Sequence, residues 1–130
     1  FGDPETQIIL PLTDTDWAQT FFDLSHGRLS PLKFKSKHAC CVVLASKGYP
    51  TVPELGDTFT LPPSTSSDQY VLHAGTDGQG EEFKTAGGRV LNVVALAGDL
   101  SQAIRSAYNL VDQVKWPGCQ YRTDIGQKLL

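Results

Sequence analysis

The sequence has 130 residues, with 14 acidic and 11 basic side chains and a formal net charge of -3. This length fits one domain that buries about two-thirds of its unfolded surface. The acidic balance without a basic run excludes a nucleic-acid-binding footprint. No apolar run approaches the length that a bilayer requires, so we expect a soluble protein without a membrane partner.

The cysteines indicate the redox compartment of the protein, and the first residues bear on where its chain starts. Cys40 and Cys41 are adjacent in an apolar stretch and cannot readily pair with each other, and Cys119 makes the count odd. We therefore expect reduced, buried thiols and a reducing, cytoplasmic compartment. The chain contains no methionine, and Phe1 does not open a signal peptide. We expect that Phe1 is not the biological start.

The first segment, GDPETQ at residues 2–7, places two carboxylates around a proline. In an extended chain Asp3 and Glu5 face the same way. Alternatively they open a helix, because proline favours the first helical position and glutamate favours the first turn. Both readings remain open.

A helix is expected from residue 14 to about residue 24. Thr13 or Thr15 can supply its N-cap, and Gly27 can end it. The spacing predicts an inner face made of Trp17, Phe21 and Leu24.

The middle of the chain reads as short strands and turns. Residues 39–45 (ACCVVLA) are typical of a buried strand, and residues 58–61 read as a short edge strand. Residues 62–69 are polar and predict a solvent loop. Residues 70–74 (YVLHA) predict a strand that forms a hairpin with residues 82–85 through a glycine-rich turn.

The clearest element is a strand followed by a helix. Residues 89–97 (RVLNVVALA) are almost wholly apolar and β-branched, as in a strand that is buried on both faces. Asp99 offers an N-cap oxygen to a helix that runs to about residue 115, where Trp116-Pro117-Gly118 ends it. Its predicted inner face contains Leu100, Ile104, Ala107, Tyr108, Val111 and Val114. Together these elements predict an α+β fold, mostly antiparallel sheet with a few flanking helices.

Two residues, Arg89 and His73, are candidates for a binding or catalytic site. Arg89 follows Gly87-Gly88, where it either caps a turn or binds an anion, because a planar guanidinium matches two phosphate oxygens. His73 near a strand end is either a structural residue or a ligand or base. The histidines have no neighbouring ligand at metal spacing, so no metal site is expected. Arg122 and Asp124 can form a surface ion pair.

Five segments in order resemble the C-terminal part of the phosphoribosylamine–glycine ligase family, also called glycinamide ribonucleotide synthetase, in the ATP-grasp superfamily. They are GDPETQ (2–7), ASKGYP (45–50), HAGT (73–76), GGRVLNVVAL (87–96) and YRTDIG (121–126). The resemblance covers essentially the whole chain. It departs from the family pattern at Thr51, Ala86 and Thr123.

The resemblance implies the function of a longer enzyme. That enzyme joins 5-phosphoribosylamine and glycine with ATP and Mg²⁺ in de novo purine biosynthesis, through a glycyl phosphate intermediate. The family's nucleotide and metal sites precede the segment seen here, so the isolated chain is expected to be inactive. Residues 1–28 would end the ATP-grasp core with a connecting helix, and residues 29–130 would form the C-terminal α+β domain.

The resemblance also implies roles for single residues. Asp3 and Glu5 would be catalytic carboxylates at the active-site edge. The substrate phosphate would be bound by Arg89 together with Gly88, Gly75, Thr76 and His73. A free-standing, non-catalytic module that binds a sugar phosphate, or a purely structural domain, is the alternative.

Overall fold

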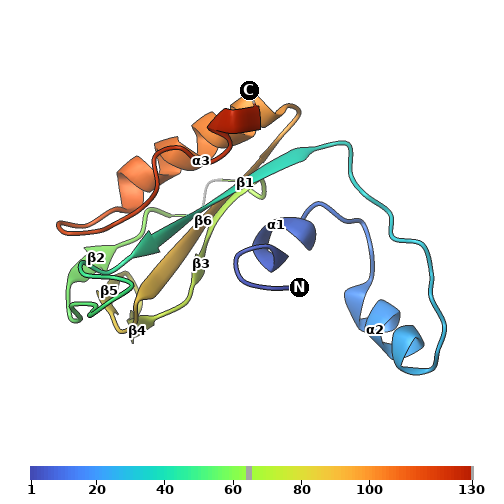
Figure 1. The fold of residues 1–130 in the computed structure, drawn as a ribbon, viewed down its shortest axis with the longest axis horizontal. Coiled ribbons are helices and arrows are strands. Elements are labelled where there is room, and N and C mark those ends of the chain that lie inside the picture. The colour runs from blue at the N-terminus through green and yellow to red at the C-terminus, as the bar shows by residue number, and fades with distance from the viewer. Residues whose placement is uncertain (64–65, 130) are drawn as a thin grey trace.

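The computed structural model describes residues 1–63 and 66–129 (Figure 1). It confirms the α+β expectation, with two antiparallel three-stranded sheets and a few helices. The elements in chain order are α1 (Thr6–Ile9), α2 (Trp17–Ser25), β1 (His38–Ala45), β2 (Thr58–Thr60), β3 (Gln69–His73), β4 (Thr76–Gln79), β5 (Glu82–Thr85), β6 (Arg89–Ala97), α3 (Leu100–Val114) and the 3-10 turn η1 (Gln127–Leu129). No helix in the described ranges is long and apolar enough to cross a membrane.

Strand β6 is the centre of the first sheet, whose order is β1-β6-β3. Every residue from 90 to 96 is buried, which confirms the prediction of a strand covered on both faces. Helix α3 packs on one face over Val42, Leu91 and Val93. The short α1 lies on the other face, where it contacts β1 and β6 (Figure 1).

Helix α3 forms where its periodicity predicts. The Asp99 carboxylate accepts a hydrogen bond from the Gln102 backbone N–H at 2.7 Å, which satisfies one of the unpaired donors of the first turn. Leu100 and Tyr108 are only partly buried, whereas Ala103 joins the core. The fully packed residues of the helix are Ala103, Ile104, Ala107, Val111 and Val114.

The predicted hairpin is wrong. Strand β3 pairs with β6, and it is β4, expected to be a turn, that forms the hairpin with β5. Gly80, with a φ of +72°, provides the turn between these two strands. Pairing with β6 lets Val71 of β3 pack against the core, which a local hairpin with β5 would not do. The predicted loop at residues 62–69 is too long, since β3 begins at Gln69, and its residues 64–65 lie outside the described ranges.

The second sheet, β2-β5-β4, is joined to the core by aromatic rings. Phe59 of β2 stacks on Trp116 with ring centroids 4.8 Å apart and on Phe83 of β5 at 5.9 Å. Trp116 follows α3, so this stack fixes the small sheet to the end of the long helix. β2 lies at the edge of its sheet, as the sequence predicts.

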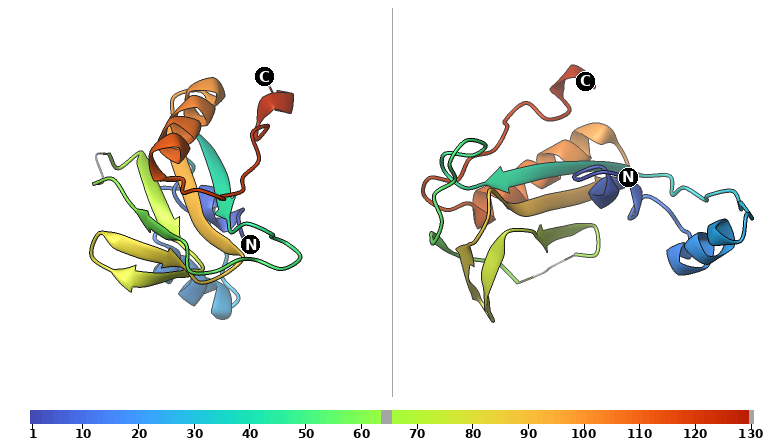
Figure 2. Two further views of the ribbon diagram at one scale, coloured as in Figure 1. Left: turned by 90° about the vertical axis from the view of Figure 1, so that its left-hand side faces the viewer. Right: turned by 60° about the horizontal axis from the view of Figure 1, so that its bottom comes forward.

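Helix α2 differs from the prediction in its start and in its face. The N-cap is Asp16, which accepts from the Gln19 N–H at 2.9 Å, and neither Thr13 nor Thr15. The Thr13 hydroxyl bonds the Leu10 carbonyl and the Trp17 indole instead, and the Thr15 hydroxyl accepts from the Lys33 N–H at 3.3 Å. The predicted inner residues Phe21 and Leu24 are each 53% exposed. The reason is visible in Figures 1 and 2, where α2 lies apart from both sheets.

Candidate functional site

A β-bulge decides where Arg89 points. Leu44 pairs with Leu91 and Ala45 pairs with Arg89, so Val90 is an extra residue on β6. Side chains alternate between the faces of a strand, and a strict register would turn Arg89 to the α3 face with Leu91. The bulge turns Arg89 to the opposite face, beside Ala45.

On that face Arg89 contacts Asp3. Arg89 Nη2 lies 3.3 Å from Asp3 Oδ2, and Nη1 donates to the Asp3 carbonyl at 3.3 Å. The other carboxylate oxygen of Asp3 accepts from Gln7 Nε2 at 2.9 Å. Both ion-pair side chains are about 40% exposed, at 42% and 41%, so the pair is worth about 1 kcal/mol or less, and an anionic ligand can compete for it.

The carboxylates of Asp3 and Glu5 therefore differ in their contacts. Asp3 contacts Arg89, whereas Glu5 is the exposed N-cap residue of α1 and makes no side-chain cap. The helix-opening reading is correct in part: α1 begins at Thr6, but the Asp3 side chain bonds Gln7 rather than a free backbone N–H.

Arg89 lines an open hollow of ≈ 400 Å³, which we call the arginine hollow. Its lining residues are Val43, Ala45, Tyr49, Arg89, Gln120, Tyr121 and Arg122. Local sequence patterns do not connect Tyr49, Tyr121 or Arg122 with a ligand site. The signal available was that two of the five family-like segments, ASKGYP and YRTDIG, contain them.

The double glycine contacts Tyr49, one of the residues that line this hollow. A Cβ on Gly88 would lie 2.6 Å from Cδ2 of Tyr49, so the tyrosine ring packs where only glycine fits. The carbonyls of Gly87 and Gly88 accept from Ser46, from its hydroxyl and N–H respectively, each at 2.8 Å. Within residues 1–63 and 66–129 neither glycine N–H donates a hydrogen bond. Two backbone donors without a hydrogen-bond partner in these ranges thus precede Arg89 in the chain.

Gly75 and Thr76 are placed differently. A Cβ on Gly75 would lie 2.6 Å from Gly87 Cα, so the two glycine backbones pack directly on each other. The Gly75 N–H donates to the Arg89 carbonyl at 2.9 Å, and the Thr76 N–H donates to the Ala74 carbonyl at 3.0 Å. These two N–H groups are used inside the fold, and Gly75 positions the Arg89 backbone.

His73 lies in a second cavity, which we call the α1 cavity. This cavity has a volume of ≈ 580 Å³ and is lined by Asp3, Thr6, Gln7, Leu10, Pro11, Tyr70, Leu72, His73, Ala74 and Asn92. His73 Nδ1 is 2.9 Å from Thr76 Oγ1, and its ring is 4.6 Å from the Phe83 ring. His73 is therefore not among the residues that line the arginine hollow.

Polar groups that the sequence did not single out also line the α1 cavity. Asn92 interrupts the apolar run of β6 and is 2% exposed, with Cys41 Sγ 3.9 Å from its Oδ1. Gln7 Oε1 is buried and has no hydrogen-bond partner in the described part of the chain. With the Asp3 carboxylate, these oxygens make the cavity rich in acceptors, which suits a ligand that carries N–H groups.

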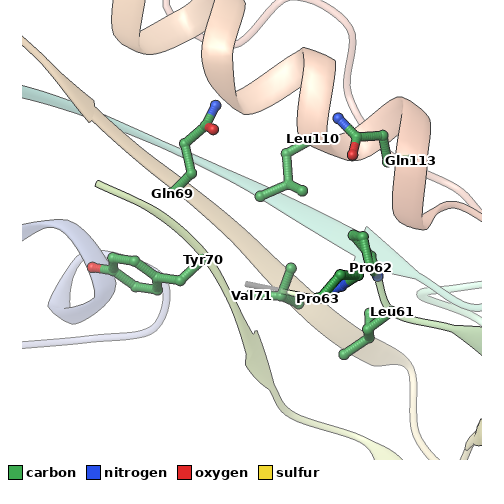
Figure 3. Close-up of a pocket in the computed structure, with 8 residues that line it drawn as sticks. All are labelled: Leu61, Pro62, Pro63, Gln69, Tyr70, Val71, Leu110 and Gln113. Atoms are coloured by element: carbon green, nitrogen blue, oxygen red, sulfur yellow. The ribbon is translucent and has the colours of Figure 1, made fainter. Parts of the chain in front are cut away.

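A third hollow has no comparable chemistry. It has a volume of ≈ 500 Å³ and lies between α3 and β3. Figure 3 shows Leu110 projecting from α3 toward Val71 and the two prolines of this hollow. Its lining has no charged residue, and the Gln69 amide donates to the Ser106 carbonyl at 3.2 Å.

The residues present do not fit a magnesium site. In the described ranges no group of three or more His, Cys, Asp or Glu side chains is placed to hold a metal ion. Mg²⁺ prefers several oxygen ligands in octahedral geometry.

Comparisons with known proteins identify the family. The family model described as phosphoribosylglycinamide synthetase, C domain, matches residues 39–128. A phosphoribosylamine–glycine ligase of Synechocystis is 43% identical over 100% of this chain and 32% of its own length. A bifunctional purine biosynthetic protein of Dictyostelium discoideum is 40% identical over 99% of this chain and 16% of its own length.

A solved structure agrees with these sequences. The crystal structure of the phosphoribosylamine–glycine ligase of Thermotoga maritima superposes with a TM-score of 0.83 at 33% identity, over 95% of this chain and 31% of that one. The chain thus spans about a third of the length of the single-function relatives it matches. This chain belongs to the phosphoribosylglycinamide synthetase family and contains the C domain of that family.

Proposed function

We propose that the chain is the C-terminal portion of a cytoplasmic ligase that joins 5-phosphoribosylamine and glycine, with ATP, to give glycinamide ribonucleotide in purine biosynthesis. Relatives that carry the ligase name are about 40% identical along essentially the whole chain. At the site, the proposal is supported above all by the bulge, which turns Arg89 away from the core toward an open hollow.

In this proposal the C-terminal portion holds the phosphate end of the substrate. The Arg89 guanidinium and the Gly88 N–H bind phosphate oxygens, since charge-assisted hydrogen bonds to phosphate are strong and directional. Gly75 and Thr76 stabilise the backbone at Arg89 rather than bind the phosphate, because the Gly75 N–H donates to the Arg89 carbonyl. His73 contacts the ribose side from the α1 cavity.

Asp3 would act at the amine end. When phosphate takes its place on Arg89, the Asp3 carboxylate is released toward the α1 cavity, which it already lines. There it can accept an N–H of the substrate amine and orient its lone pair for attack on the activated glycine. Glu5, which is exposed at the start of α1, would contribute as a second carboxylate.

ATP and Mg²⁺ would be held by the rest of the ligase. Residues 1–28 would end that core and residues 29–130 would form the C-terminal domain. The exposed Phe21 and Leu24 of α2 favour this division, because apolar groups on a helix that lies apart from the sheets favour a packing partner. The isolated chain is then expected to be inactive.

A chimera tests the proposal. The corresponding third of the Synechocystis ligase is replaced by this chain, and formation of glycinamide ribonucleotide from 5-phosphoribosylamine, glycine and ATP is measured. Activity that falls at least tenfold with Arg89→Gln, and stays unchanged with the exposed Arg105→Gln, supports the proposal. A folded chimera without activity contradicts it.

A further inference from the structure

We propose that Arg122 is the second cation of the phosphate site, that Asp124 positions it, and that the arginine hollow selects a dianionic phosphomonoester. This inference rests on the proposed function and adds to it a residue and a charge preference. Its basis is that two arginines far apart in the sequence line one hollow.

The sheet brings these arginines together through Ala45. Ala45 pairs with Arg89 on one side, and on the other side it exchanges two backbone hydrogen bonds of 2.8 Å with Gln120. Arg89 and Gln120 thus flank Ala45 at a backbone separation of about 10 Å, two strand spacings. Arg122 follows Gln120 by two positions and lines the same hollow. Two side chains of this length can reach a phosphate between them.

The tail that carries Arg122 is anchored by the core. The Tyr108 hydroxyl, from α3, donates to the Arg122 carbonyl at 2.8 Å and accepts from the Ile125 N–H at 3.0 Å. Gly126, with a φ of +77°, packs where a Cβ would lie 2.5 Å from Ile104 Cδ1. The backbone of Arg122 is therefore fixed relative to the hollow.

Asp124 orients the guanidinium. Arg122 Nε and Nη2 donate to the two carboxylate oxygens of Asp124 at 2.8 and 2.6 Å. This geometry uses one edge of the planar group and leaves Nη1 available. The Arg122 side chain is 71% exposed, so a ligand in the hollow can reach it.

Two cations favour the more highly charged form of a phosphate. The lining contains Tyr49 and Tyr121 but no histidine, and the facing carboxylates are Asp3 and Asp124. The second ionisation of a phosphomonoester has a pKa of about 6. Affinity should therefore rise between pH 5 and pH 7 because the ligand gains a charge.

The test titrates this chain with ribose 5-phosphate and follows backbone amides by NMR at pH 5, 6 and 7. Arg122→Gln should weaken binding at pH 7 at least tenfold and flatten the rise in affinity with pH. Arg122→Lys should restore part of both, and Asp124→Asn should weaken binding severalfold without removing the charge of Arg122. Arg105→Gln, on the exposed side of α3, is the matched control.

Each result decides between the two proposals. If Arg122→Gln keeps both the affinity and the pH profile while Arg89→Gln loses binding, the role of Arg122 is overturned and the ligase function stands. If the backbone amides of the wild-type chain do not shift at ten millimolar ribose 5-phosphate, the chain does not bind the phosphate, and the role of Arg122 is overturned in this case too. An inactive chimera with intact two-arginine binding overturns the ligase function alone. Should Arg122→Gln perturb the whole spectrum, Asp124→Asn and Arg122→Lys decide.

Discussion

Arg89 and Asp3, 86 positions apart, form an ion pair whose two partners line different hollows. Arg89 lines the arginine hollow and Asp3 lines the α1 cavity. A ligand that takes one partner therefore frees the other. In the proposed function the phosphate of the substrate therefore binds in the arginine hollow and its amine in the α1 cavity.

Asp3→Asn should separate binding from catalysis. Without the carboxylate charge, Arg89 is free for phosphate, so the affinity of the chain for ribose 5-phosphate should rise by up to about fivefold, the range of an exposed ion pair. In the chimera the same change should lower turnover by about 10² or more, because the group that orients the amine is lost. Asp77→Asn on β4 is the matched control. Unchanged phosphate affinity in Asp3→Asn would show that Asp3 does not compete for Arg89.

Gly75→Ala should destabilise the protein by about 1–3 kcal/mol, since the added methyl lies 2.6 Å from Gly87 Cα and 2.8 Å from the Arg89 carbonyl. Gly98→Ala is the control, because no atom lies within 4 Å of its Cβ position. Its effect should stay within about 0.5 kcal/mol. Urea unfolding of both variants measures the difference, and equal midpoints would refute the close packing of the two glycine backbones.

Asp99→Ala should lower the free energy of unfolding by about 1 kcal/mol, because the Gln102 N–H of α3 loses its acceptor. The same substitution at Asp16, the cap of α2, should affect global unfolding less, since α2 has no buried residue. Circular dichroism during urea unfolding compares them. A larger loss for Asp16→Ala would mean that α2 belongs to the cooperative core.

Because the pKa values of two thiols are raised, we expect the free energy of unfolding to fall at alkaline pH. Burial raises the pKa of the Cys41 thiol to about 12 and that of Cys119 to about 11. In the unfolded chain both titrate near pH 8.5, so above that pH the unfolded state releases protons that the folded state keeps. The stabilising contribution is complete below pH 8.5 and is lost as the pH rises toward 11–12.

Two measurements check this sign. The urea midpoint should fall steadily from pH 8.5 to pH 10.5, and maleimide labelling of Cys41 at pH 8 should be slow until urea unfolds the chain. Cys41→Ala should show a shallower fall. A flat midpoint with fast labelling would place the thiol in solvent.

Local patterns predicted the central strand and the long helix. A run of β-branched residues from 89 to 97 and a spacing of three and four from Leu100 to Val114 are properties of neighbouring residues, and so is the Asp99 cap. Arg89 at the start of β6 is a candidate site residue for a local reason too, because it directly follows Gly87-Gly88. Its neighbours in space were not, because they come from distant segments.

Sequence patterns alone are enough to predict the α+β class, the buried strand, the long helix and, through five short segments, the family. The folded structure is needed to establish that β3 pairs with β6, that one extra residue turns Arg89 away from the core, and that Arg122 lines the same hollow as Arg89. The physical reason is that strand partners and register are chosen by burial over the whole chain. A shift of one residue reverses the face of a side chain without changing its local sequence.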